Sequence, residues 1–337
     1  MNKKAIILII CLICIALSFS TATASDAGES DANETLSVSV SESVDTNDNL
    51  TSTSIEVDDN LQAGSGGGSF SDLDALLHNR ANEYKLTQNY TYNPETDSAF
   101  LNGISITSSI TIDGDGYTID GNGQARIFDI NPHNIILKNI RFINGYSTQS
   151  GGAIYVEGDD TLEIINCNFM NNTAGVHGGA IYLENSNASK ITSCYFANNT
   201  AGVNGGAVDW HKGATHGELI GSNFVNNTAK RSGGAVFWYG VDGDIKDSNF
   251  TNNKALGIAM GQSTYGYYST GGDGGAVMWT GHNGDIINSR FIGNNASRRG
   301  GAVFMQGASD ENCDNLTIDL STFEDNYARV NGGAVDW

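Results

Sequence analysis

Three closely spaced aspartates are the first residues that could do chemistry. Asp113, Asp115 and Asp120 form the densest acidic group among the strand-like segments of the chain. Clustered carboxylates can serve as general acid and base, or can bind Ca²⁺ beside an Arg or Lys that acts as the base. Each of the three is followed by glycine, however, and Asp-Gly pairs are typical of tight turns. We therefore expect turn residues here, with acid–base chemistry as the alternative.

A second candidate group is Asp209, His211 and Lys212, which follow one Gly-Gly-Ala sequence. A carboxylate close to an imidazole can prepare it as a general base. At the corresponding places of the neighbouring repeats we find no second acid or base, so the sequence predicts no catalytic residue. No cysteine or histidine spacing resembles a zinc or haem site, and we expect neither a metal ion nor a cofactor.

A repeat must position these side chains. The unit Phe-x-x-Asn followed by Gly-Gly-Ala-Ile/Val recurs between Phe142 and Trp337, with intervals of 27, 27, 28, 41, 26 and 32 residues between successive Gly-Gly pairs. A fixed period of this length is typical of solenoids and propellers. Short Val/Ile/Phe runs broken by Gly and Asn indicate strands and turns, and about 27 residues is short for a four-stranded propeller blade. The sequence therefore predicts an all-β fold, a parallel β-helix.

Matching residues of successive repeats would stack along the solenoid at a strand spacing of about 4.8 Å. Asn recurs three residues after Phe; we expect these amides to form a ladder, in a turn that asparagine's tolerance of left-handed angles favours. The Gly-Gly pair is expected to supply a positive-φ turn. Cys167 and Cys194 occupy matching positions that carry Ser in later repeats, so we expect two buried thiols in a Cys/Ser ladder. Cys313 has no evident partner.

Two rows of side chains follow the Gly-Gly-Ala sequences on alternate faces of a strand. One row contains Trp210, Trp238 and Trp279, and alternation places it with the Ile/Val positions of the core. The other row is expected to form a partly apolar outer stripe, suited to sugars or protein partners, through Tyr155, Tyr182, Phe237 and Phe304. If the two faces are reversed, the three tryptophans form the exposed binding stripe instead.

One turn is longer than the others. Phe250 and Gly274 are 24 residues apart, against 9 in the other six repeats, and the insertion from about Ala255 to Asp273 is rich in Gly and Tyr. Tyrosine gives a broad contact area at low entropic cost, so Tyr265, Tyr267 and Tyr268 are candidate binding residues of a recognition loop. A neutral surface insertion explains the same sequence equally well.

The repeats resemble a known family. The sequences FMNNTAGVHGGAI and FANNTAGVNGGAV are similar to the repeat of chlamydial polymorphic outer-membrane proteins and of adhesin-like surface proteins of methanogenic archaea. The resemblance covers about residues 101 to 337, and of the two groups we expect the archaeal one. It implies a right-handed, pectin-lyase-like β-helix, exposure at the cell surface and adhesion, and it names no ligand.

The N-terminal residues predict secretion. Residues 1–24 combine Lys3 and Lys4, an apolar run and a small-x-small cleavage site, as in a signal peptide, so we expect no membrane span in the mature chain. Residues 25–68 hold ten acidic residues and no basic one, which is typical of a disordered spacer. With a formal net charge of −21 and few Lys or Arg, nucleic-acid binding is not expected.

Residues 69–100 are expected to cap the solenoid. Ser71 suits a helix N-cap, and Leu73, Leu76 and Leu77 fall on one helical face that could cover the first coil. Residues 101–337 would be the β-helix, truncated at Trp337, with the anchor in a missing C-terminal part. Partial glycosylation is expected at the sequons, which begin at Asn33, Asn49, Asn89, Asn171, Asn187, Asn198, Asn226, Asn249, Asn295 and Asn315.

Together these features predict a secreted, extracellular or cell-surface, adhesin-like β-helix that attaches to surface glycans or proteins of other cells without catalysis. One alternative is a carbohydrate-active β-helix enzyme, a polysaccharide lyase or a glycoside hydrolase. Another is a rigid surface stalk.

Overall fold

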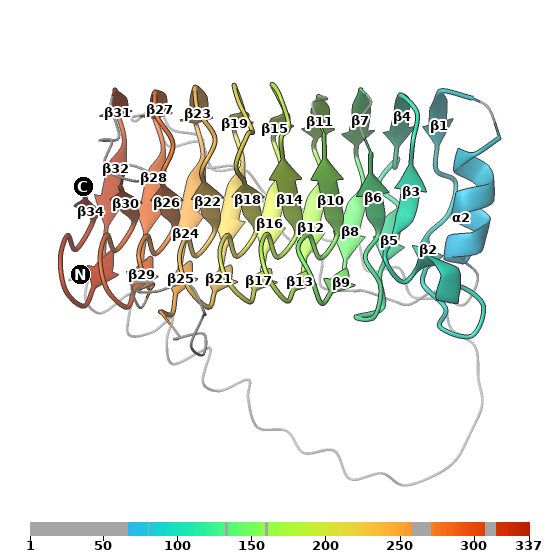
Figure 1. Ribbon diagram of the computed structural model, residues 1–337, viewed down its shortest axis with the longest axis horizontal. Coiled ribbons are helices and arrows are strands. Elements are labelled where there is room, and N and C mark those ends of the chain that lie inside the picture. The colour runs from blue at the N-terminus through green and yellow to red at the C-terminus, as the bar shows by residue number, and fades with distance from the viewer. Residues whose placement is uncertain (1–66, 80, 132–133, 159–160, 258–270, 307–314) are drawn as a thin grey trace, which may run out of the picture. The chain divides into compact units, whose positions relative to one another are not determined.

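The structure is a computed structural model that describes residues 67–79, 81–131, 134–158, 161–257, 271–306 and 315–337. The predicted signal peptide, the acidic spacer up to residue 66, the three tyrosines of the insertion and Cys313 lie outside these ranges. In the described part the chain winds through parallel strands that form four sheets along the solenoid (Figure 1). The predicted all-β parallel β-helix is therefore confirmed.

Each full coil passes through four sheets, which we number 1 to 4 and which the chain visits in the order 1, 2, 4, 3. Sheet 1 has nine strands: β1 (Glu83–Lys85), β4 (Ile110–Asp113), β7 (Ile135–Lys138), β11 (Leu162–Ile165), β15 (Lys190–Thr192), β19 (Glu218–Ile220), β23 (Gly243–Lys246), β27 (Gly284–Ile287) and β31 (Leu316–Asp319). Sheet 2 has nine: β2 (Tyr90–Thr91), β5 (Thr118–Asp120), β8 (Arg141–Ile143), β12 (Asn168–Met170), β16 (Tyr195–Ala197), β20 (Asn223–Val225), β24 (Asn249–Thr251), β28 (Arg290–Ile292) and β32 (Thr322–Glu324).

Sheet 3 carries the strands that follow the Gly-Gly-Ala sequences. Its nine strands are β3 (Ile104–Ile106), β6 (Phe128–Ile130), β10 (Ile154–Glu157), β14 (Ile181–Glu184), β18 (Val208–Trp210), β22 (Val236–Trp238), β26 (Val277–Trp279), β30 (Val303–Met305) and β34 (Val335–Asp336). Sheet 4 has seven short strands: β9 (Tyr146–Ser147), β13 (Thr173–Ala174), β17 (Thr200–Ala201), β21 (Thr228–Ala229), β25 (Lys254–Ala255), β29 (Asn295–Ala296) and β33 (Tyr327–Ala328).

The repeat keeps its register through the sheets. Phe169 pairs with Phe142 on one side and Phe196 on the other, and the phenylalanine rings from Phe142 to Phe323 stack with centroids 4.6 to 4.9 Å apart. The tryptophans form a second internal stack, with Trp210, Trp238 and Trp279 at 4.3 and 4.7 Å. Because these tryptophans are at most 1 % exposed, their predicted place in the core is confirmed.

The predicted asparagine ladder is present inside the solenoid. Asn172, Asn199, Asn227, Asn253 and Asn294 are fully buried, and the side-chain oxygen of each accepts from the backbone of the preceding coil. The left-handed backbone lies one residue earlier than expected, at the residue directly before the ladder, for example with φ of 56° at Asn198. The corner must turn before the ladder asparagine, so that this side chain can enter the core.

The two glycines of each pair have different reasons to be glycine. The first adopts the expected positive φ, for example 64° at Gly205. A Cβ on the second would lie far inside the van der Waals contact distance of the next coil: at Gly206 it would be 2.0 Å from the carbonyl oxygen of Gly234. The pair therefore sets both the turn and the distance between coils.

The Cys/Ser ladder is also confirmed. Cys167 and Cys194 are free thiols at most 1 % exposed, and the backbone N–H of Cys167 lies 3.4 Å from Cys194 Sγ. Serine oxygens accept the same bond in later coils, starting with Ser222 Oγ, which takes the N–H of Cys194 at 3.1 Å. Burial raises the pKa of Cys167 well above its ordinary value, so this thiol stays protonated.

Helix α2 (Phe70–Leu77) covers the first coil, and a 3₁₀ turn, η1 (Ser98–Phe100), follows (Figure 1). Leu73 and Leu77 are buried in the same cluster as the core, as the sequence predicted. The N-cap is Ser69 instead of Ser71, because the Ser69 hydroxyl oxygen accepts from the backbone N–H of Asp72 at 3.1 Å in a capping box. Ser71 bonds to Asp97 instead, which accepts from its backbone N–H at 3.1 Å and from its hydroxyl at 2.6 Å. Among the described residues no helix is long and apolar enough to cross a membrane.

Candidate functional site

The outer face of sheet 3 carries the residues that the sequence singled out for binding. Strand alternation turns one residue of each strand outward while its neighbours enter the core. We call this set the outer row: Asp129, Tyr155, Tyr182, Asp209, Phe237, Met278, Phe304 and Asp336. The expected assignment of the two faces is thus correct, and the alternative, an exposed stripe of Trp210, Trp238 and Trp279, is wrong.

The outer row is less exposed than we expected. Tyr182 is 5 % exposed, Phe237 8 % and Phe304 2 %, so the row is not an open apolar stripe. Charged side chains from the flanking turns cover it: the guanidinium of Arg126 lies 4.9 Å from the Tyr155 ring centre, and that of Arg299 lies 4.0 Å from the Phe304 ring centre. Cation–π contact holds both arginines over the rings, and what the face presents is charge and hydrogen-bonding groups.

Two matching tyrosine–glutamate pairs occupy successive coils. The rings of Tyr155 and Tyr182 stack at 5.3 Å with 13° between their planes. Each hydroxyl donates to a carboxylate two residues later, Tyr155 to Glu157 at 2.8 Å and Tyr182 to Glu184 at 3.1 Å. Burial, followed by the negative charges of Glu157 beside Tyr155 and of Asp209 and Glu184 beside Tyr182, raises the pKa of both phenols above their ordinary value. Both tyrosines are therefore neutral hydrogen-bond donors at physiological pH.

Next along the row is a buried carboxylate between two imidazoles. Asp209 is fully buried, and its Oδ1 lies 3.2 Å from His211 Nδ1 in a hydrogen bond. Its Oδ2 lies 3.2 Å from His177 Nδ1, although the angles there do not form a hydrogen bond. Burial lowers the pKa of His211, but the hydrogen bond and charge of Asp209 outweigh it and raise that pKa above its ordinary value.

This arrangement corrects the expectation that no second acid or base lies near Asp209. His177 precedes Gly178 in the turn before β14, so it does not occupy the repeat position of His211. The coil-to-coil stacking brings its ring to 5.2 Å from the His211 ring. A comparison of equivalent repeat positions misses such a pair; the signal that could have revealed it is the single His in the residue before a Gly-Gly pair.

An aspartate bridges two arginines further along the same face. Asp273 is 2 % exposed and precedes the Gly-Gly pair of β26. Its Oδ1 accepts from Arg298 Nε at 2.7 Å and from Arg299 Nε at 3.1 Å, and its Oδ2 accepts from the Nη2 of both arginines. Because a buried carboxylate is costly unless it is paired, the two guanidinium groups explain its burial. The trio was not identified from the sequence.

The Asp-Gly aspartates are turn residues, as expected. Asp113 Oδ1 accepts from the N–H of Asp115 at 3.1 Å and from the Asn139 side chain at 2.9 Å. Burial pushes the pKa of Asp113 up, but these hydrogen bonds and Lys138 hold it below its ordinary value. Asp120 accepts in the same way from the N–H of Asn122 at 2.7 Å. Asp113 and Asp120 therefore each stabilise a corner of the solenoid.

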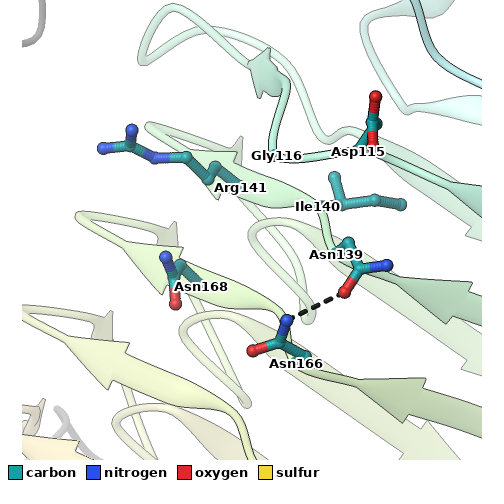
Figure 2. Close-up of a pocket in the computed structure, with 7 residues that line it drawn as sticks. All are labelled: Asp115, Gly116, Asn139, Ile140, Arg141, Asn166 and Asn168. Carbon is teal, nitrogen blue, oxygen red and sulfur yellow. Dashed lines mark hydrogen bonds between the residues drawn. The ribbon is translucent and has the colours of Figure 1, made fainter. Parts of the chain in front are cut away.

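A polar hollow of about 460 Å³ lies where sheets 1 and 2 meet at this corner. Figure 2 shows Asn166 donating to Asn139 inside it, at 2.8 Å, while Arg141 and Asn168 extend from neighbouring strands. Arg141 points away from Asp115, so the charged groups of the hollow do not converge. Nowhere in the described ranges do three or more His, Cys, Asp or Glu side chains form a group that could hold a metal ion.

Comparison with known proteins identifies the repeat. A family model described as the Chlamydia polymorphic membrane protein repeat matches residues 166–184 and 193–209, which include β12, β14 and β16. Neither the comparison with curated proteins nor that with solved structures finds a match. The chain therefore carries polymorphic-membrane-protein-type repeats folded as a parallel β-helix, a combination that fits a surface or adhesin-like protein.

Proposed function

We propose that this chain is a secreted cell-surface protein that attaches to glycans or proteins of other cells through the outer row of sheet 3. Its repeats support a surface role, because the matching family model describes a membrane protein repeat. We further propose that it belongs with the adhesin-like surface proteins of methanogenic archaea, because its Phe-x-x-Asn and Gly-Gly-Ala-Ile/Val sequences resemble their repeats. Attachment needs no chemistry from the chain.

The tyrosine–glutamate pairs of β10 and β14 are the observation that carries this proposal. Four hydrogen-bonding groups stand in two parallel copies, one coil apart, on strands whose other face is packed in the core. A rigid support keeps the entropic cost of binding low. Because the rings are covered by each other and by Arg126, the groups that this surface offers to a ligand are the tyrosine hydroxyls and the glutamate carboxylates. Such a row of hydroxyl and carboxylate groups suits the hydroxyl groups of a sugar.

A glycan and cell-surface binding array tests the proposal. The wild-type chain should bind, and a variant with both Tyr155→Ala and Tyr182→Ala should lose at least about tenfold in affinity. Tyr327→Ala is the matched control, because this tyrosine is 56 % exposed on sheet 4, away from the outer row. Equal binding by the wild type and the double variant, at similar melting temperatures, would exclude the outer row as the attachment surface.

The group around Asp209 favours catalysis on carbohydrates as a second candidate. A buried carboxylate commonly orients an imidazole that acts as a general base, as Asp209 orients His211 here. His177, Tyr182 and Glu184 lie beside this pair. Incubation with polygalacturonate and neutral polysaccharides, followed by analysis of chain length, tests this candidate. Cleavage that is lost in His211→Gln would support it, and intact polymers after long incubation would exclude it for those substrates.

A further inference from the structure

The trio of Asp273, Arg298 and Arg299 has more positive charge than its internal pairing requires. Two guanidinium groups share a single carboxylate, which leaves an excess of one positive charge on the outer face of sheet 3. We propose that Arg298 and Arg299 bind the carboxylate or sulfate group of an anionic polysaccharide. This inference rests on the proposed attachment function and names the chemical class of its ligand.

Hydrogen-bond geometry leaves the two arginines able to bind a second anion. Asp273 occupies Nε and Nη2 of each guanidinium, and Arg299 Nη2 also lies 3.4 Å from Gln306 Oε1. The Nη1 groups of Arg298 and Arg299 have no hydrogen-bond partner within the described ranges. Since a guanidinium carries five N–H donors in a planar fork, its Nη1 edge can take an oxyanion while its Nε edge keeps Asp273.

The site is held in place before any ligand arrives. The Arg298 and Arg299 side chains are 22 % and 27 % exposed, and Asp273 beneath them is buried. Stacking over Phe304 at 4.0 Å also fixes the plane of the Arg299 guanidinium. A pre-organised, partly desolvated cation pair loses little side-chain entropy on binding, and its charge-assisted hydrogen bonds are stronger than those of a mobile surface arginine.

The position of the trio on the outer row favours a linear polymer. The row runs along the solenoid axis, with Tyr155 and Tyr182 in earlier coils and the arginine pair further on. A polysaccharide lying along this row could place sugar hydroxyls at the tyrosine–glutamate pairs and an oxyanion at the arginines. Because Glu157 and Glu184 repel anions at the tyrosine end, we expect spaced rather than continuous negative charge along the ligand.

Binding of defined polymers to the full chain tests the proposal. The probes are hyaluronan, which carries carboxylates only, chondroitin sulfate, which adds sulfates, neutral dextran and poly-glutamate. Arg298→Gln and Arg299→Gln should each weaken binding of an anionic polysaccharide by about tenfold or more. Arg290→Gln is the matched control, because it removes one positive charge from β28 on sheet 2, away from the outer row. The Arg290 side chain is 55 % exposed and pairs with Glu324 at 3.1 Å.

A charge-preserving variant separates binding from folding. Arg299→Lys keeps the positive charge and loses the planar fork, so it should still weaken binding while the melting temperature stays close to that of the wild type. If the wild type binds cells or dextran but neither anionic polysaccharide, the inference is wrong and attachment stands. Binding of poly-glutamate as tight as that of the polysaccharides overturns the assignment to a polysaccharide. If neither cells nor any polymer binds, the proposed attachment itself fails.

Discussion

Replacing Asn227 by Ala should destabilise the solenoid far more than the loss of one small polar side chain suggests. Asn227 is fully buried in the asparagine ladder. Its side-chain oxygen accepts from the backbone N–H of Asn199 at 3.0 Å and from the Asn199 amide at 2.9 Å. Its own amide donates to the Phe196 carbonyl and to Asn253 Oδ1, each at 3.0 Å. Alanine removes all four bonds.

The magnitude follows from the groups that are left unpaired. Two buried donors of Asn199 lose their acceptor, and a buried polar group without a partner costs about 1 to 3 kcal/mol. We therefore expect Asn227→Ala to lower the free energy of unfolding by about 2 to 5 kcal/mol. For a domain of this size that corresponds to a fall in melting temperature of roughly 5 to 15 °C.

Chemical and thermal unfolding, followed by far-ultraviolet circular dichroism, measure this loss. Asn249→Ala is the control, because Asn249 is exposed on β24 and, among the described residues, its side chain bonds only to the Asn223 side chain, at 3.0 Å. The control should stay within about 0.5 kcal/mol of the wild type. If the two variants unfold with equal free energies, the ladder is not what holds the coils together at this corner.

Three further predictions concern the turns and the buried charges. Gly206→Ala should prevent folding or cost several kcal/mol, because its Cβ would lie 2.0 Å from a carbonyl oxygen of the next coil, whereas Gly221→Asn, at φ 58° with open space, should melt like the wild type. Burial raises the pKa of Asp97, but its hydrogen bonds outweigh burial and lower that pKa below its ordinary value. The stabilisation that Asp97 gives is therefore present above about pH 3.8 and is lost as the pH falls through the folded-state pKa. The free energies of unfolding of Asp97→Asn and the wild type should converge in acid. The pKa of His211 beside Asp209 is raised, so its stabilising contribution depends on pH in the opposite direction to that of Asp97. The wild type should exceed His211→Gln in stability most below about pH 6.5, and the difference should shrink as the pH rises.

The fold could be predicted from the sequence because its constraints repeat. Phe, Asn and Gly-Gly recur at positions that must pack, pair or turn identically in each coil, so seven copies of the repeat support the same structural assignment. The Trp row was assigned correctly for the same reason, since strand alternation relates it to the Ile/Val positions. When residues at equivalent repeat positions share one geometric constraint, the structural role of one position can be inferred from the others.

The misses involve contacts between residues at different positions of the repeat. Arg126 and Arg299 fold over the outer row from flanking turns, and His177 approaches Asp209 from another coil. The N-cap of α2 is Ser69, which pairs with Asp72 in a capping box, while Ser71 bonds to Asp97 from a distant turn. Such contacts depend on the side-chain conformations and on which coils are neighbours, and neither the repeat period nor the composition of the sequence encodes them.

Side-chain footprinting of the bound protein tests the central claim, attachment through the outer row, most directly. The full chain is exposed to hydroxyl radicals with and without the tightest binder from the glycan and cell-surface array, and the modification of each tyrosine is read by mass spectrometry. We predict that binding protects Tyr155 on sheet 3 and leaves Tyr327 on sheet 4 unchanged. Protection of Tyr327 with no change at Tyr155 would contradict the claim and place attachment on another face of the solenoid.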